Sequence, residues 1–344
     1  MNTQNSSTPQ AQNPLGDAEQ PSGKTPVQRI SLIAGPLIAL LMVLVPPPAS
    51  LGYVGWATAA MGIWMAIWWA TEAVPVAATA LLPLALFAPL DILDIKSASA
   101  PYANPTIYLF LGGFILAAAL QKSGLHRRIA YFILGYANTG AKSIIWGFML
   151  VSAVLSMWMT NTSTTMMLLP IALSIISTLN KGEQTMSGQE TKHFNLALLL
   201  GIAYAATIGG MVTLVGTPPN AFLAGFMNDT YGLQIGFAQW MLVGLPLAVV
   251  MLPLCFWVLT KVVFPVNFRT PQEAKKRLLE QQKQLGSASK AEKRVGSIFL
   301  LVALAWMTRP LLEDWFSLTG ISDAGIAMLA AVAVFVVPAG GKQT

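Results

Sequence analysis

The sequence predicts an all-α polytopic membrane protein, and three observations support that class. Of the 344 residues, 55% are hydrophobic and only 10% are charged, whereas soluble domains carry about 25% charged residues. The mean hydropathy is +0.61. Apolar runs of about 18 residues or more recur along the whole chain, and that length lets a helix cross a membrane. The runs are continuous rather than alternating, which disfavours a membrane β-barrel.

The chain begins with a polar segment, residues 1–28, where its richness in Pro, Ser and Gln predicts a disordered tail. This segment lacks the basic start, apolar core and cleavage site of a signal peptide, so we expect the first apolar run to stay in the mature protein. The predicted apolar segments are 30–47, 53–70, 74–90, 104–121, a long run at 143–180, 194–226, 237–262, 295–312 and 320–338.

Basic residues predict how these segments are oriented. One alternating path through the membrane leaves only Lys96 and Arg309, of the 20 Lys and Arg residues, on the outer side. This path predicts a multi-pass protein of a bacterial cell inner membrane with a cytoplasmic N-terminus, and it explains the net charge of +6 without nucleic acid. The single Cys255 lies within an apolar run and predicts neither a disulfide framework nor a metal cluster.

The run 143–180 is too long to be a single span. Lys142 and Lys181 flank it, and the sorting of charges places both on the inner side. One helix of this length would extend about 57 Å, against a hydrocarbon core of about 30 Å, so the run must turn back. The natural turn is the polar stretch Thr160 to Thr165. Because the second apolar arm, 166–178, is too short to span, a re-entrant hairpin is favoured over two full crossings.

A second interruption is the motif "GTPPN", Gly216 to Asn220. Its two prolines cannot donate backbone hydrogen bonds, so a helix cannot continue through them unbroken. Thr217 followed by Pro218 has the pattern of an N-cap with Pro at the first helical position. We expect a new half-helix to begin here, within the membrane. Taken alone, the motif also fits a purely structural kink.

Together the two interruptions predict a binding site. We expect Thr162 or Ser163 to cap the returning arm of the hairpin, so that two half-helix N-termini face the same depth. Such N-termini carry unpaired N–H groups and favour an anion. Freed backbone carbonyls and the Asn161 amide oxygen suit a cation such as Na⁺. The alternative is that these hydroxyls only bond back to their own helix, which is common for single residues.

The sequence resembles the divalent anion:Na⁺ symporter family of dicarboxylate, citrate and sulfate carriers. Four stretches carry the resemblance, in the family's order: "WWATEAVPVAATALLPL", "FLGGFILAAALQKSGLHRRIA", "MWMTNTSTTMMLLPI" and "GTPPNAFLAG". The resemblance covers roughly residues 30 to 340. It implies an inverted-repeat transporter, each half with a re-entrant hairpin and a broken helix, that forms a homodimer and works by an elevator-like motion.

The resemblance also implies which residues bind the ion and the substrate. The implied Na⁺ ligands are Ser156, Thr160, Asn161 and Gly216. The implied contacts of a substrate carboxylate are Asn161, Thr162 and Thr217. The hairpin tip reads Thr160-Asn161-Thr162 where the family has Ser-Asn-Thr, so the hydroxyl is kept.

The second half departs from the family's pattern. The family has another hairpin tip and another broken helix, and neither follows the basic linker here. "AWMTRPL" echoes "WWATEAVP", as an internal repeat would. We therefore expect a disordered tail at 1–28, a first membrane repeat at 29–262, a cytoplasmic basic linker at 263–294, and the truncated start of a second repeat at 295–344.

These features predict a secondary active transporter of small di- or tricarboxylate anions, of the succinate, malate and fumarate or the citrate class, coupled to Na⁺. We expect the truncated chain to be inactive in transport, because half of the site is missing. One alternative is a Na⁺-independent anion exchanger of the same fold, and another is a non-transporting membrane fragment. An enzyme has little support, since the chain contains neither HExxH nor GxSxG.

Overall fold

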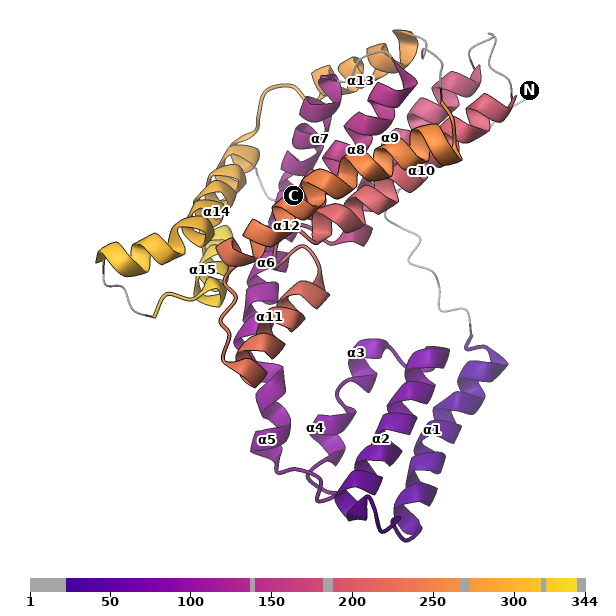
Figure 1. The fold of residues 1–344 in the computed structure, drawn as a ribbon, viewed down its shortest axis with the longest axis vertical. Helices are drawn as coiled ribbons and strands as arrows, with labels where there is room; N and C mark the ends of the chain where they lie inside the picture. Colours follow the sequence, from indigo (N-terminus) through magenta and orange to yellow (C-terminus); the bar gives the residue numbers. More distant parts are fainter. Residues whose placement is uncertain (1–22, 137–139, 182–187, 267–271, 317–319, 339–344) are drawn as a thin grey trace, which may run out of the picture. The chain divides into compact units, whose positions relative to one another are not determined.

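The fold is helical throughout the residues that the structure describes. The computed structural model describes residues 23–136, 140–181, 188–266, 272–316 and 320–338, and these contain helices and turns but no strand. They form two compact units, Met1–Ala103 and Asn104–Thr344, each of which is described by itself (Figure 1).

Unit 1 is built around a pair of packed helices. Its elements are α1 (Pro26–Leu44), α2 (Gly52–Thr71), α3 (Val76–Thr79), α4 (Leu82–Leu86), α5 (Ile95–Ser99) and a 3₁₀ turn, η1 (Ala100–Ala103). The indole of Trp68 on α2 donates to the carbonyl of Ser31 on α1 at 3.1 Å. The apolar segment predicted at 74–90 forms two short helices, α3 and α4, rather than one. Pro83 lies in the first turn of α4, where a proline is tolerated.

Helix α1 begins earlier than the predicted start at residue 30. Thr25 and Gln28 form a reciprocal capping box, and Pro26 occupies the first helical position, where its missing N–H costs nothing. The last residues of the predicted tail are thus helical, while residues 1–22 lie outside the described residues.

Unit 2 contains the two interruptions that the sequence predicts. Its elements are α6 (Pro105–Ser123), α7 (Leu125–Gly135), α8 (Ala141–Ser156), α9 (Asn161–Lys181), α10 (Gly188–Gly210), α11 (Pro218–Tyr231), α12 (Phe237–Trp257) with a π-helical turn η2 (Val258–Val263), α13 (Gln272–Gln284), α14 (Lys290–Phe316) and α15 (Asp323–Val336). The long run 143–180 is confirmed as a hairpin, α8 and α9, joined by residues 157–160. The run 194–226 is confirmed as a broken helix, α10 and α11, interrupted at 211–217.

The hairpin packs against α10 to form the largest core of the unit. Figure 1 shows α8, α9 and α10 side by side, and Ile145, Phe148, Leu168 and Leu198 are fully buried among them. A Cβ on Gly209 would lie 2.1 Å from the carbonyl oxygen of Ala153, so only glycine lets α10 approach the backbone of α8 this closely. This close approach brings the interruption of α10 next to the end of α8.

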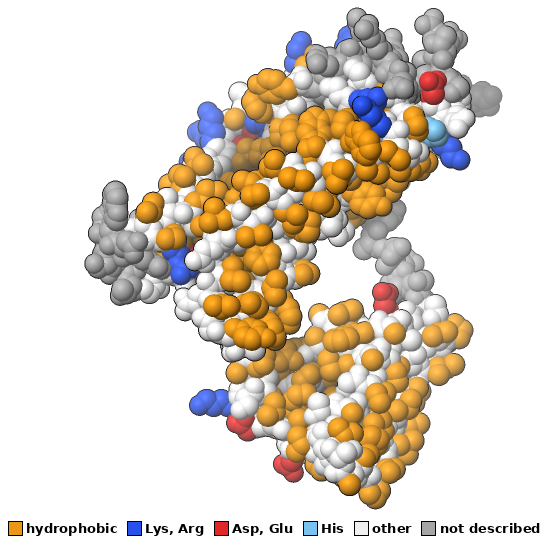
Figure 2. Space-filling view, in the orientation of Figure 1, with side chains coloured by type: hydrophobic (Ala, Val, Ile, Leu, Met, Phe, Trp, Pro, Cys, Tyr) orange, Lys and Arg blue, Asp and Glu red, His pale blue; other side chains and the backbone are white. Residues whose placement is uncertain are grey.

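Among the described residues, five helices are long and apolar enough to cross a membrane: α1, α6, α10, α12 with η2, and α14 up to Leu311. Large aliphatic side chains such as Leu242 and Val243 of α12 are more than 70% exposed, as lipid-facing residues are. Hydrophobic side chains cover much of the visible surface in Figure 2, and in unit 2 the Lys and Arg side chains gather toward the end that carries α13. The chain is therefore a multi-pass helical membrane protein.

Two helices of unit 2 were not among the predicted spans. Helix α7 carries His126, Arg127 and Arg128, and α13 lies inside the segment that the sequence predicts as a linker. Both helices are short and carry several charged residues. In the sequence they therefore resemble polar connections between spans, although the chain forms helices there.

Candidate functional site

The hairpin tip is a four-residue connection with a capped helix after it. Helix α8 ends at Ser156 and α9 begins at Asn161. The hydroxyl oxygen of Thr160 accepts a hydrogen bond from the backbone N–H of Ser163 at 3.2 Å, and its proton points to the Ser163 hydroxyl at 2.9 Å. Thr160 is therefore the cap. The expectation of Thr162 or Ser163 was wrong because α9 already begins at Asn161, before both of them.

A buried asparagine, Asn220, ties the two sides of the broken helix together across the interruption. Thr217 occupies the N-cap of α11 in an extended conformation, with Pro218 after it, as the sequence predicts, although its side chain makes no capping hydrogen bond. The Asn220 amide nitrogen donates to the carbonyls of Gly210 at 2.9 Å and of Thr213 at 2.7 Å. Asn220 is 6% exposed, so these bonds satisfy backbone groups that water does not reach.

The tip and the interruption meet each other. The Ser156 hydroxyl donates to Oδ1 of Asn161 at 2.6 Å. A Cβ on Gly210 would lie 2.3 Å from that same Oδ1. A Cβ on Gly216 would lie 2.5 Å from the carbonyl oxygen of Gly210 and 3.0 Å from that of Ser156. The Thr213 hydroxyl, which lies in the interruption, donates to the carbonyl of Met157 in the tip.

The meeting point gathers oxygen atoms of one chemical kind. The carbonyl oxygens of Ser156 and Gly210 lie beside Gly216, and Oδ1 of Asn161 lies beside Gly210. These are uncharged, hard oxygen ligands, the kind that the backbone of an unwound helix offers to a monovalent cation. The N-termini of α9 and α11 begin at the same two interruptions, and helix N-termini favour negative charge.

The predicted site residues are placed unequally. Ser156, Asn161 and Gly216 lie together at the meeting point. Thr160 is next to them in the chain, but its hydroxyl is engaged in the cap of α9. Thr162 is exposed and Thr217 is half-buried. Prediction from the sequence missed three residues of this site, Gly210, Thr213 and Asn220. Gly210 belongs to the glycine pair Gly209-Gly210 and Asn220 ends the motif "GTPPN", whereas Thr213 gave no signal.

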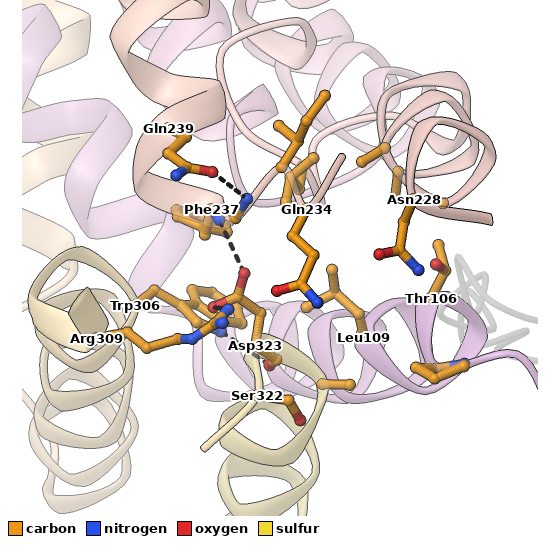
Figure 3. A pocket seen from close by; sticks show the side chains of 18 of the residues that line it. Thr106, Leu109, Asn228, Gln234, Phe237, Gln239, Trp306, Arg309, Ser322 and Asp323 are labelled. Carbon is orange, nitrogen blue, oxygen red and sulfur yellow. Dashed lines mark hydrogen bonds and ion pairs between the residues drawn. The ribbon is translucent and has the colours of Figure 1, made fainter. Parts of the chain in front are cut away.

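A cavity of mixed polar and apolar wall borders the interruption (Figure 3). Its volume is ≈ 480 Å³, and its lining includes Leu214 from the interruption and Ala221 of α11. Arg309 of α14 and Asp323 of α15 form an ion pair at 3.0 Å in this wall. The second carboxylate oxygen of Asp323 accepts from the Phe237 N–H at 2.8 Å. These bonds join the first residues of α12 and α15 to α14.

Comparison with known proteins gives results of two kinds. The model of the sodium:sulfate symporter transmembrane region matches residues 27–339. The sodium-dependent dicarboxylate transporter SdcS of Staphylococcus saprophyticus is 38% identical over 318 residues, which are 92% of this chain and 61% of that protein. SdcS of Staphylococcus aureus strain USA300 is 38% identical over 314 residues, 91% of this chain and 60% of that protein. The chain thus spans about three fifths of the length of these curated relatives.

Proposed function

The chain belongs to the family of the sodium:sulfate symporter transmembrane region, and from this premise we propose that it serves the Na⁺-coupled transport of small di- or tricarboxylate anions. The observation that carries the proposal is the meeting of the hairpin tip with the interruption of the broken helix. The two relatives described above are named as sodium-dependent dicarboxylate transporters, which supports succinate-like dianions as the substrate class. No covalent chemistry is needed, since relatives of this kind are transporters and not enzymes.

The proposed Na⁺ ligands are Ser156, Thr160, Asn161 and Gly216. The carbonyl oxygens of Ser156 and Gly210 lie beside Gly216, and this supports Ser156 and Gly216 and adds the Gly210 carbonyl to the set. The Asn161 Oδ1 beside Gly210 supports Asn161. Na⁺ at this point would offset the partial negative charge of the converging carbonyls. It would also fix the Asn161 amide, which the Ser156 hydroxyl already holds by one bond.

The proposed contacts of the substrate carboxylate are Asn161, Thr162 and Thr217. Thr162 lies in the first turn of α9 and Thr217 occupies the N-cap position of α11, so both lie at helix N-termini, where backbone N–H groups lack partners within the helix. The two hydroxyls have no hydrogen bond within the described residues. They therefore remain available to donate to a carboxylate.

The coupling of Na⁺ binding to anion binding would follow from a residue that both sites share, Asn161. Because Asn161 would contact both the ion and the anion, Na⁺ binding would orient its side chain and raise the affinity for the anion. By linkage the anion would raise the affinity for Na⁺ by the same factor. Loading both together would also lower the cost of moving a dianion through a low-dielectric membrane.

Three further features of the proposal concern the whole protein. We place the N-terminus in the cytoplasm of a bacterial cell, with the multi-pass chain in the inner membrane, because this orientation leaves only Lys96 and Arg309 of the 20 Lys and Arg residues outside. The gathering of basic side chains at one end of unit 2 supports a cytoplasmic position for that end. We also propose a homodimer. The division into a first repeat at 29–262, a linker at 263–294 and a second repeat from 295 remains part of the proposal.

The test is binding of Na⁺ and succinate by the purified chain in detergent. Its thermal midpoint should rise with NaCl but not with choline chloride at equal ionic strength, and succinate should raise it further only in NaCl. At 100 times its Kd a ligand stabilises the fold by about 2.7 kcal/mol, which a thermal scan resolves. Succinate stabilisation that is equal in choline would favour the Na⁺-independent exchanger. The absence of any Na⁺-specific shift would overturn the proposal.

A further inference from the structure

A second cavity of unit 2 adjoins the hairpin but not the interruption of the broken helix. Its volume is ≈ 800 Å³, and it lies among the end of α6, α7, α9 and α13. Helix α13 packs against α7, and Figure 1 shows α13 at the end of the unit that α7 reaches. The polar residues of its wall are Gln121, His126, Arg127, Tyr131, Ser163, Gln281 and Gln284.

The wall of this cavity carries positive charge and no negative charge. No Asp or Glu is among its lining residues, all of which belong to the described part of the chain. Burial lowers the pKa of the His126 imidazole, which keeps that ring neutral at pH 7. The guanidinium of Arg127 therefore supplies the charge of the wall, and the ion pairs between described residues include none that neutralises it.

The neighbouring Arg128 differs, because all three nitrogens of its guanidinium donate hydrogen bonds. Its Nε and Nη2 donate to the two carboxylate oxygens of Glu292 at 2.9 and 3.1 Å. Its Nη1 and Nη2 also donate to the carbonyls of Gly286 and Leu285. These bonds fix the segment after α13 against α7. The two adjacent arginines thus have different roles. Arg128 holds the segments around the cavity together, and Arg127 gives the cavity wall its positive charge.

The uncharged groups of the wall are arranged to donate hydrogen bonds. The hydroxyl of Tyr131 donates to the Gln281 amide oxygen at 3.1 Å, which leaves the NH₂ group of Gln281 free to donate. The Ser163 hydroxyl accepts from Thr160 and keeps its own proton for another acceptor. One guanidinium with amide and hydroxyl donors is the set that recognises a carboxylate.

The cavity also reaches the helix that carries the candidate site. Ser163 and Met166 belong to the first two turns of α9 and follow Asn161 and Thr162, with which this helix begins. An anion in the cavity would therefore lie beside the same helix turn that the proposed function assigns to the substrate.

We propose that the cavity among α7, α9 and α13 is a second binding site for a small carboxylate, with Arg127 as its charged ligand. The inference rests on the proposed function for the choice of anion. The site would collect the dianion beside the hairpin before or after it occupies the tip. Arg127 is an exposed cation without an ion-pair partner among the described residues, and in a concavity of mixed polar and apolar wall it raises the local anion concentration.

The experiment measures the charge and the occupancy of the cavity directly. The chain has one cysteine, so Cys255→Ser gives a cysteine-free background into which Gln284→Cys places a thiol at the wall. The thiol is labelled in detergent with anionic and with cationic methanethiosulfonates. The anionic reagent should react faster, and Arg127→Gln should lower the anionic-to-cationic rate ratio about fivefold. Succinate at millimolar concentration should slow the labelling.

Matched variants separate the cavity from its surroundings. Lys122→Gln removes the same charge from the last turn of α6, outside the wall, and should leave the ratio unchanged, while Arg127→Lys should restore it. A ratio that Arg127→Gln does not change, or labelling that succinate does not slow, would overturn the proposed cavity site. The Na⁺-specific thermal shift tests the proposed function separately. A negative labelling result would therefore overturn only the cavity site, and a missing Na⁺-specific shift would overturn the proposed function.

Discussion

The Ser156 hydroxyl donates a hydrogen bond to Oδ1 of Asn161 at 2.6 Å, and this bond joins the last residue of α8 to the first residue of α9. This oxygen also packs so closely against Gly210 that a Cβ on that glycine would lie only 2.3 Å from it. The amide oxygen of Asn161 is thus fixed from the hairpin and pressed against the end of α10. Its position depends on both interruptions at once.

Replacing Ser156 by Ala should weaken the proposed Na⁺ site more than the fold. The hydrogen bond to Asn161 contributes about 0.5–1.5 kcal/mol, and its loss frees the amide to rotate. We expect the Na⁺-specific rise in thermal midpoint to shrink markedly. The matched control is Ser152→Ala, because the Ser152 hydroxyl is buried on the same helix and donates to the Ile202 carbonyl at 2.7 Å. That variant should lose similar stability and keep its full response to Na⁺.

Gly210→Ala should abolish the response to Na⁺, because its methyl group needs the space that Oδ1 of Asn161 occupies. The control is Gly62→Ala in α2, where a Cβ has no atom within 4 Å. Removing a helical glycine there should leave Na⁺ binding unchanged and raise helix stability by about 0.5–1 kcal/mol. Titration of the thermal midpoint with NaCl compares the two, and an undiminished response in Gly210→Ala would refute the packing described for Asn161.

Asn220→Ala should destabilise the broken helix by about 1–3 kcal/mol, since it leaves the buried carbonyls of Gly210 and Thr213 without their donor. Asn220→Asp should cost more, because a carboxylate would face two carbonyl oxygens. Asn228→Ala on the exposed side of the same helix should change stability by less than about 0.5 kcal/mol. Chemical denaturation measures all three, and equal effects at both asparagines would contradict the role assigned to Asn220.

Arg128→Gln should release α13 from α7. The side chains of Arg128 and Glu292 are 27% and 7% exposed, so solvent screens their ion pair only in part, and we expect a loss of about 1–2 kcal/mol. Hydrogen exchange of the α13 amides should become faster. Lys293→Gln, which removes a positive charge beside Glu292 at an exposed position, should leave that exchange unchanged. If the α13 amides stay protected from exchange in Arg128→Gln, the hydrogen bonds of Arg128 do not hold α13 in place.

Much of the fold follows from local patterns in the sequence. Apolar length gives the long helices, and the run 143–180 had to reverse because it exceeds one membrane thickness. The Thr217-Pro218 start of α11 follows from cap chemistry that is the same in any protein. Helices α7 and α13 do not follow, because short charged helices at the ends of spans look like polar connections.

The site could be predicted only in part. Asn161 and Ser156 stand out as polar residues at a forced reversal. Asn220 does not, because its two acceptors lie seven and ten residues earlier and reach it only through the path of the unwound backbone. Gly210 likewise matters through a contact with another helix, which no local pattern encodes.

The most direct measurement is the Na⁺-specific thermal shift of Asn161→Ala beside that of the native chain, with NaCl compared against choline chloride at constant ionic strength. Asn161 is the residue that the proposed ion and anion sites share. We expect the native chain to be stabilised by Na⁺ and further by succinate in Na⁺, and we expect Asn161→Ala to lose both shifts while Asn228→Ala keeps them. If Asn161→Ala retains the native response to Na⁺ and succinate, the hairpin tip is not the binding site.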